Sequence, residues 1–478
     1  MTTNSPLTAN ADSPKRSPGM TGRQRIALVV LLAAGFTLAV DFSVLNVALP
    51  AIGADVGFTI ENLQWIATSF ALCSAGFTLL MGRIADLAGR RRMFLIGMAL
   101  LGTGSLLGGL ATTAELLLAA RVAQGFATAI VIPAALSLLL GTFAEGRTRD
   151  RALGLNGSLM AAGFTTGAIL GGYLTDLLSW RWAFFINVPI AVAVLIVAPV
   201  VLRESRATTR TALDIPGAIT VTLGLLALVF GLTSAAESSW TGPATLIPLA
   251  LAVLLLGSFV LIERRSPFPL VPLPLIARPN IAWGNVAGVL AFATETSLVF
   301  LLTLYLQKVL GYTPLAAGFS FAALGVGTVI GGLLGPRIIA RFGSKAAIVG
   351  GFILQGIVTM PLVLLTDAAA SAWLLLGATF IGGVANLVLI VGFMVTATSG
   401  LRNEEQGLGT GLATMSQQVG IVLGTPIMSA VFAAVVLHSD AASSDAVLAG
   451  VTAAIWVNGG ICLTAAAAVW LFLRPRTS

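Results

Sequence analysis

The fold is decided by residues 82–93, which read GRIADLAGRRRM. This short, charged segment separates two apolar runs, 65–81 and 94–110, and each run approaches the roughly 20 residues that cross a bilayer as a helix. Two helices joined by so short a turn form an antiparallel hairpin. Because three consecutive arginines cross a membrane only at high cost, we expect this turn on the cytoplasmic side.

The composition of the chain is that of a membrane protein. Of its 478 residues 57% are hydrophobic and 9% are charged, and its mean hydropathy is +0.98. These values exclude a soluble globular protein and predict an all-α polytopic membrane protein. The net charge of +7 does not indicate a nucleic-acid-binding protein, because the basic residues occur in small groups between apolar runs.

Several kinds of site are excluded by residue counts. Cys73 and Cys462 are the two cysteines and lie inside apolar runs, and His438 is the single histidine. Neither a disulfide framework nor a Cys- or His-rich metal site is therefore expected. None of the three lysines follows a glycine, which excludes a Walker A phosphate loop. Active transport would need an ion gradient or a separate ATPase subunit, and we expect no cofactor apart from protons as coupling ions.

Apolar runs of spanning length recur along the whole chain. We predict fourteen helices, at 26–49, 63–81, 93–111, 116–140, 153–177, 182–202, 215–235, 243–262, 281–306, 315–336, 346–365, 371–396, 407–436 and 448–472. The even number places both termini in the cytoplasm. The basic residues agree, because the predicted outer loops hold only Arg181 and Lys308, and every other one except Arg121 lies in an inner loop or a tail.

The helices divide into six, two and six. Residues 336–345, PRIIARFGSK, echo the 82–93 stretch at the mirrored position in the second half of the chain. We therefore predict two pseudo-symmetric six-helix bundles separated by an inserted pair. The predicted units are a disordered cytoplasmic tail at 1–25, an N-terminal bundle at 26–202, a two-helix insertion with linkers at 203–279, a C-terminal bundle at 280–473 and a cytoplasmic tail at 474–478.

Five motifs in order resemble signatures of one family. Residues 82–91, RVAQG at 121–125 and the glycine pattern at 163–172 resemble three signatures of the major facilitator superfamily. DFSVLNVALP at 41–50 and WRWAFFINVP at 180–189 resemble its fourteen-helix drug:proton antiporter branch. The chain departs from these signatures at three positions: Leu87 stands where the loop signature often has arginine, Ala168 replaces the proline of the antiporter signature, and Ala340 replaces the aspartate in the second loop copy.

The resemblance implies a proton-coupled exporter of lipophilic, cationic or amphipathic drugs that works by alternating access. Its partners would be a small-molecule substrate, protons and the lipid bilayer, with no nucleic acid, and the protein would be a monomer in a bacterial plasma membrane. The excess of arginine over lysine, with many alanines and glycines, is typical of a GC-rich bacterial genome.

Other functions stay open at this stage. One alternative is a dedicated exporter of a single endogenous metabolite, antibiotic or lipid in the same fold. A more remote one is a non-transporting receptor or scaffold, for which charged residues inside spans would have little purpose. An enzyme is not expected, because no nucleophile–base pair or metal-binding set is present in the sequence.

Asp41 and Arg121 are candidate proton-coupling residues. At 1.5 Å per residue they lie about 13 Å and about 9 Å below the outer ends of the first and fourth predicted helices, so they could meet if those helices are neighbours. A charge inside a bilayer costs at least ~2.5–3.5 kcal/mol on insertion scales, so such groups are usually paired and functional. The alternative is a static ion pair that fixes helix packing.

Glu295 is the third candidate and lies near the middle of the ninth predicted helix, with no basic residue in its own span. It could exchange a proton with a cationic substrate, so we predict both proton coupling and substrate binding for it. The alternative is a protonated group bonded to a neighbouring helix. Polar residues inside other spans are further candidates for the cavity lining: Asn46, Gln124, Asn386 and Gln417.

Two further sets have predicted conformational roles. The loop signature predicts a latch, in which Asp86 accepts hydrogen bonds at the N-terminus of a neighbouring helix; its residues are Gly82, Asp86, Gly89, Arg90 and Arg91. The antiporter signature predicts close approach of another helix, with simple tight packing as the alternative to a hinge; its glycines are Gly163, Gly167, Gly171 and Gly172.

Overall fold

The computed structural model describes residues 20–58, 62–143, 147–206, 214–237, 240–267, 269–270, 273–368, 370–401, 406–436 and 444–473. All regular elements within these ranges are helical. Most of the two predicted tails, and His438, lie outside the described residues.

The first half of the fold consists of α1 Gly22–Val56, α2 Gln64–Ala88, α3 Arg90–Gly109, α4 Ala114–Thr142, α5 Arg147–Leu177, α6 Trp182–Phe185 and α7 Asn187–Val201. The helices α8 Ile215–Glu237, α9 Pro243–Arg265 and α10 Leu273–Ile276 follow. The second half consists of α11 Pro279–Leu304 with a π-helical turn Tyr305–Val309, α12 Pro314–Ser320, α13 Ala322–Thr359 with a 3-10 turn Met360–Leu364, α14 Ser371–Ala397, α15 Gln406–Val436 and α16 Ser444–Phe472.

Local sequence signals fix the ends of several helices. Thr21 caps α1 in a capping box with Gln24, and Gly57 ends the same helix with a left-handed φ of 90°. Gly89 has a φ of 116° and separates α2 from α3, so the 82–93 stretch forms the expected tight turn between two antiparallel helices. The hairpin that the charged stretch predicts is therefore confirmed.

Eleven helical stretches of the described chain are long and apolar enough to cross a membrane, and the bent helix α2 would make twelve. The predicted number of fourteen is not confirmed by this count. One reason is that residues 314–364 count as a single stretch, although the non-helical φ and ψ of Gly343, 84° and 163°, mark a kink inside α13. The other is α5, which begins with four charged residues at 147–151 and is not among the counted stretches.

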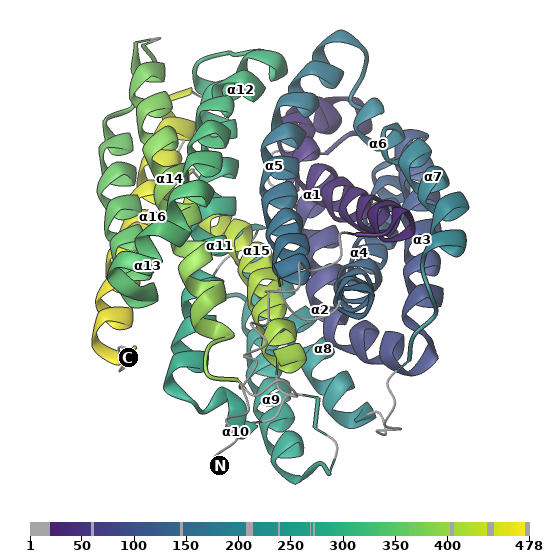
Figure 1. Ribbon diagram of the computed structural model, residues 1–478. Helices are drawn as coiled ribbons and strands as arrows, with labels where there is room; N and C mark the ends of the chain where they lie inside the picture. Colours follow the sequence, from purple (N-terminus) through teal and green to yellow (C-terminus); the bar gives the residue numbers. More distant parts are fainter. Residues whose placement is uncertain are drawn as a thin grey trace, which may run out of the picture.

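The two halves repeat the same helix pairings. In the first half α1 packs on α5, α4 and α7, and α4 packs on α2 and α3; in the second half α11 packs on α15, α14 and α16, and α14 packs on α13 (Figure 1). Close backbone contacts recur too. A Cβ atom on Gly167 would lie 2.8 Å from the carbonyl oxygen of Val40, and one on Gly424 would overlap the carbonyl oxygen of Ala293. Gly163 on Phe36 corresponds in the same way to Gly420 on Val289, and we therefore assign Val40 and Ala293 to equivalent positions.

The halves meet mainly at the end of the molecule that lies away from the 82–93 turn. There α5 lies beside α12 (Figure 1), and a Cβ atom on Gly318 would lie 2.8 Å from the carbonyl oxygen of Ala168. Gln307 donates to the carbonyl oxygen of Val47 at 2.8 Å between the first and second halves. Closer to the middle, Gln418 of α15 donates to the hydroxyl of Ser74 of α2 at 2.7 Å.

The inserted helix α8 lies against both halves. Its Thr222 hydroxyl donates to the carbonyl oxygen of Gly76 in α2 at 2.7 Å, and its contact with α15 includes apolar side chains such as Leu225, Val229 and Val422. The inserted helix therefore contacts α2 of the first half and α15 of the second.

Candidate functional site

Asp41 and Arg121 form a buried ion pair, as their predicted depths suggested. Arg121 Nη1 lies 3.1 Å from Asp41 Oδ2, and the two side chains are 1% and 0% exposed. Helices α1 and α4 are neighbours, which brings the two charges together. A pair so deeply buried is stable only when its remaining hydrogen-bonding capacity is also satisfied.

The surroundings of the pair supply that capacity. Gln124 Nε2 and Asn187 Nδ2 donate to Asp41 Oδ1 at 2.8 Å and 2.5 Å. The Ser105 hydroxyl in turn accepts from both amides, at 2.8 Å and 3.2 Å. All of these side chains are buried. Asp41 therefore has three donors from two helices of its own half, and it has no direct route to solvent in this conformation.

Arg121 is held on its other side as well. Its Nε donates to the carbonyl oxygen of Ile66 at 3.0 Å, its Nη1 donates to Gln124 Oε1 at 2.8 Å, and its guanidinium carbon lies 4.3 Å from the ring centroid of Phe70. The ring face adds a cation–π attraction. Since Ile66 and Phe70 belong to α2, a change at the ion pair would be felt by α1, α2 and α4 together.

Sequence reasoning missed Asn187 and Ser105 as members of this site. Asn187 is part of the WRWAFFINVP stretch, which we read only as a family motif. An asparagine in the middle of an apolar run was the available signal, because a buried amide needs partners. Ser105 carries no such signal, since a hydroxyl inside a helix can bond to its own backbone.

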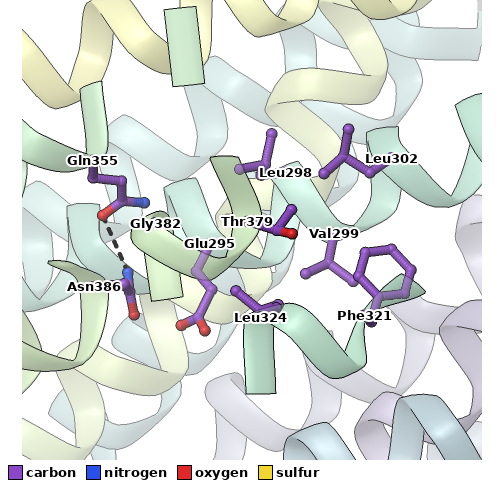
Figure 2. A pocket seen from close by; sticks show the side chains of 10 residues that line it. All are labelled: Glu295, Leu298, Val299, Leu302, Phe321, Leu324, Gln355, Thr379, Gly382 and Asn386. Atoms are coloured by element: carbon purple, nitrogen blue, oxygen red, sulfur yellow. Dashed lines mark hydrogen bonds between the residues drawn. The ribbon is translucent and has the colours of Figure 1, made fainter. Parts of the chain in front are cut away.

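Glu295 lies in a different environment. It is half-buried in the middle of α11 and lines a small cavity with Gln355, Thr379, Asn386 and a group of apolar residues (Figure 2). The space between the lining residues, counted together with the open space in front of them, is about 340 Å³. Among the described residues, no hydrogen bond or ion pair reaches the Glu295 carboxylate, so this acidic group has no compensating charge or donor.

A second polar cluster lies beside this cavity. Gln355 donates to the Thr294 hydroxyl at 3.3 Å, Asn386 donates to Gln355 Oε1 at 3.3 Å, and Asn458 donates to the carbonyl oxygen of Thr294 at 2.9 Å and to the Ser297 hydroxyl at 3.0 Å. The cluster joins α11, α13, α14 and α16, just as the first joins α1, α3, α4 and α7. It contains no ionic pair.

The repeat also shows which residues correspond. Since Val40 and Ala293 are equivalent, Thr294 takes the place of Asp41, and Glu295 lies one position further along its helix. Gly125 and Gly383 likewise pack on equivalent carbonyls, of Phe70 and Leu324, so Thr379 takes the place of Arg121. The two carboxylates that the sequence places in the first helix of each bundle are therefore not symmetry equivalents.

The remaining predicted lining residues are placed unevenly. Asn386 lines the Glu295 cavity, whereas Gln124 belongs to the Asp41 cluster. Gln417 is half-buried in α15 and is not among the residues that line the cavity. The side chain of Asn46 lies outside the described part of the structure.

The loop residues make contacts within the first half. Asp86 Oδ1 accepts from Arg90 Nε at 2.8 Å, and Arg91 donates to the carbonyl oxygens of Pro199 and Leu202 at 3.2 Å and 3.3 Å. Glu204 occupies the N-terminus of α3, where it accepts from the backbone N–H groups of Arg91 and Arg92 at 3.0 Å and 3.2 Å. In this conformation the shown contact of Asp86 is with Arg90 inside the turn, and the latch stays a prediction.

The glycines of α5 fall into two groups. Gly163, Gly167 and Gly171 each face a carbonyl oxygen of α1, which confirms the predicted close approach of another helix. Gly172 instead faces the carbonyl oxygen of Pro314 at the start of α12, so its contact is between the halves. Gly82 faces the ring of Pro133 in α4, where a Cβ atom would lie 3.2 Å away.

Known proteins resemble this chain over most of its length. It is 36% identical over 406 residues to the cephamycin export protein CmcT of Amycolatopsis lactamdurans, with 84% of each chain covered. It is 34% identical over 462 residues to the puromycin resistance protein pur8 of Streptomyces alboniger, covering 94% of this chain and 91% of that protein.

The fold is similar to that of a solved bacterial homologue of the human lysosomal transporter Spinster, with a TM-score of 0.66 and 16% identity over 96% of this chain and 100% of that one. A family model described as Major Facilitator Superfamily matches residues 31–425, which cover most of the first half and the second half as far as α15, but not α16 with Asn458. The protein is a multi-pass membrane transporter that belongs to the Major Facilitator Superfamily.

Proposed function

We propose that this protein exports lipophilic, cationic or amphipathic compounds, including antibiotics, in exchange for protons. The observation that carries the proposal is the contrast between its two intramembrane carboxylates. Asp41 is paired with Arg121 and closed off from solvent, whereas Glu295 faces a cavity with no partner. A carrier that exchanges a proton for a cation needs a carboxylate that either one can neutralise.

The arrangement of the halves supports alternating access. Their described contacts lie in the middle of the molecule and at the end away from the 82–93 turn, and we infer from this that the cavity opens toward the turn end. If the turn is cytoplasmic, this is a conformation that loads substrate from inside. Rocking the halves about the middle would then expose Glu295 to the other side.

Asp41 would set the balance between the two conformations. Protonation would remove its attraction for Arg121, which also bonds to α2, so the packing of α1, α2 and α4 would change with the charge on Asp41. An inward proton flow can drive this cycle, because its electrical part supplies ~2.3 kcal/mol per charge per 100 mV.

The proposal includes a topology. We propose fourteen helices in a six–two–six order, both termini in the cytoplasm and a monomeric unit. The kink at Gly343 divides residues 314–364 at the position of the second basic loop, which supports counting them as two spans. Labelling of single cysteines at positions 16 and 239 from outside intact cells tests the orientation; labelling at position 16 would contradict it.

An exporter of one dedicated compound is the second candidate function. The names of two relatives, a cephamycin export protein and a puromycin resistance protein, each give a single antibiotic. A susceptibility panel in a pump-deficient bacterial host, with and without an uncoupler, separates the candidates. Resistance to several unrelated cationic compounds that the uncoupler abolishes is expected; resistance to one compound alone would favour the dedicated exporter, and resistance insensitive to the uncoupler would contradict proton coupling.

A further inference from the structure

We propose that the Glu295 cavity selects ammonium ions that carry at least two N–H bonds, namely protonated primary and secondary amines, over quaternary ammonium ions. This inference rests on the proposed function, because it names the substrate class of the same cavity. It follows from a count of the hydrogen-bond donors and acceptors on the cavity wall.

The cavity has a polar side and an apolar side. Figure 2 shows Glu295, Gln355 and Asn386 on one side of the space, and Leu302, Val299 and Phe321 toward the other. This division matches the polarity of a cationic head group on an apolar body. The polar side therefore decides which head group is accepted.

The donors of two polar lining residues are already used by the protein. The Asn386 amide nitrogen donates to the carbonyl oxygen of Ala291 and to Gln355 Oε1, both at 3.3 Å, and the Thr379 hydroxyl donates to the carbonyl oxygen of Leu375 at 2.8 Å. These bonds also fix the Asn386 amide orientation, because turning it would place its oxygen against two oxygens. Gln355 gives one N–H to Thr294 and keeps one.

Two hydrogen-bond acceptors on the cavity wall, in contrast, have no partner among the described residues. Asn386 is 2% exposed, and its Oδ1 atom has no hydrogen-bond partner among the described residues. The Glu295 carboxylate has none either, and Figure 2 shows its oxygens pointing to the same side as the Asn386 oxygen. Asn386 is particular to the second half, since Thr128 holds the equivalent place in the first half and donates to its own backbone at 3.0 Å.

A bound cation must therefore supply N–H donors for these acceptors as well as a positive charge. A protonated primary or secondary amine can donate one N–H to Glu295 and another to Asn386. A quaternary ammonium satisfies the charge but presents only methyl groups, which leaves a buried acceptor without a partner. Such a loss weakens binding by about tenfold or more.

The test uses four derivatives of one lipophilic fluorophore, ending in a primary amine, a methylated secondary amine, a trimethylammonium group or a neutral acetamide. Their dissociation constants are measured on the purified full-length protein in detergent, and their efflux is measured in energised everted vesicles. We expect the two amines to bind about tenfold or more tightly than the trimethylammonium compound. Equal dissociation constants for all three cations would overturn the inference.

Two variants locate the effect. Asn386→Leu should weaken binding of the two amines to the affinity of the trimethylammonium compound. The affinity of the trimethylammonium compound itself should not change. Asn285→Ala removes an amide that bonds to Ile281 and Ser416 elsewhere on α11, and it should keep the tenfold preference. If Asn386→Leu still binds the amines more tightly than the trimethylammonium compound, Asn386 is not the acceptor that selects them. If no derivative shows uncoupler-sensitive efflux, the proposed function fails; if all the cations are exported without preference, only this inference fails.

Discussion

Arg121 Nη1 lies 3.1 Å from Asp41 Oδ2, and both side chains are at most 1% exposed. Among its described residues the second half of the repeat has no such pair, because Thr379 and Thr294 occupy the equivalent positions. The buried ion pair thus lies in one half, while Glu295, whose carboxylate has no partner among the described residues, lies in the other. This asymmetry separates two tasks that the proposed antiport requires, and each can be tested on its own.

We predict that Asp41→Asn abolishes uphill efflux of every substrate. The change keeps the size of the side chain but removes the charge that attracts Arg121 and can be neutralised by a proton. Breaking a buried ion pair from one side costs about 3–5 kcal/mol, so expression must be matched before comparison. Efflux is measured in everted vesicles with an imposed pH gradient. Accumulation above equilibrium by Asp41→Asn would contradict the coupling role.

We predict that Glu295→Gln spares neutral substrates and loses cationic ones. The amide is similar in shape but offers a cation no charge, and the surrounding wall holds no other acidic residue. Efflux of one cationic and one neutral compound, at matched expression, provides the measurement. Equal loss of both compounds would assign Glu295 to coupling alone, and unchanged transport of the cation would remove it from the site.

We predict that Gly172→Val prevents closure of the halves at the end away from the 82–93 turn. A Cβ atom there would overlap the carbonyl oxygen of Pro314, a backbone atom that cannot turn aside. Spin labels at the exposed positions Tyr173 and Phe319 should report a longer distance in this variant than in a Gly172 background. Gly377→Ala is the matched control, because nothing lies within 4 Å of its added Cβ atom. An unchanged distance would show that this contact does not hold the end closed.

We predict that Glu204→Gln destabilises the N-terminus of α3. Glu204 accepts hydrogen bonds from two N–H groups that have no partner inside the helix, and its charge favours that end of the helix dipole. The loss should be about 1 kcal/mol, seen as earlier thermal unfolding in detergent. Asp176→Asn, which alters an exposed carboxylate elsewhere, should leave unfolding unchanged. The prediction is wrong if the two variants unfold alike.

The Asp55–Arg181 pair at the other end gives a pH-dependent prediction. Hydrogen bonds from Arg181 and from the Trp180 indole, at 2.6 Å and 2.9 Å, hold the pKa of Asp55 below its ordinary value. A lowered pKa means that the stabilisation is complete above the ordinary value of about 3.9 and is lost as pH falls through the lowered value. Asp55→Asn should therefore unfold earlier than the parent at pH 7, and the difference should shrink below about pH 4. If the difference in unfolding between the parent and Asp55→Asn grows as the pH falls, the pKa of Asp55 is not lowered by this pair.

The sequence by itself determined the class of fold and the buried charges. The cost of placing arginine in a bilayer identified the 82–93 turn, and the same cost marked Asp41, Arg121 and Glu295 as exceptional inside apolar runs. Helical rise alone placed Asp41 and Arg121 at similar depths, and their contact followed once α1 and α4 were neighbours. The family motifs added the transporter class.

Only the tertiary structure decided which polar groups share a site. Ser105 and Asn187 join Asp41 because α3 and α7 pack around α1 and α4, and no spacing within one helix encodes that arrangement. The role of Glu204 at α3, 113 residues from Arg91, likewise depends on where α7 ends. Sequence periodicity fixes the face of a helix that is apolar, but the partner of each buried polar atom is set by packing between helices far apart in the chain. The sequence places Asp41 and Glu295 in the first predicted helix of each bundle, and only the backbone contacts of the repeat place Glu295 one residue out of register with Asp41.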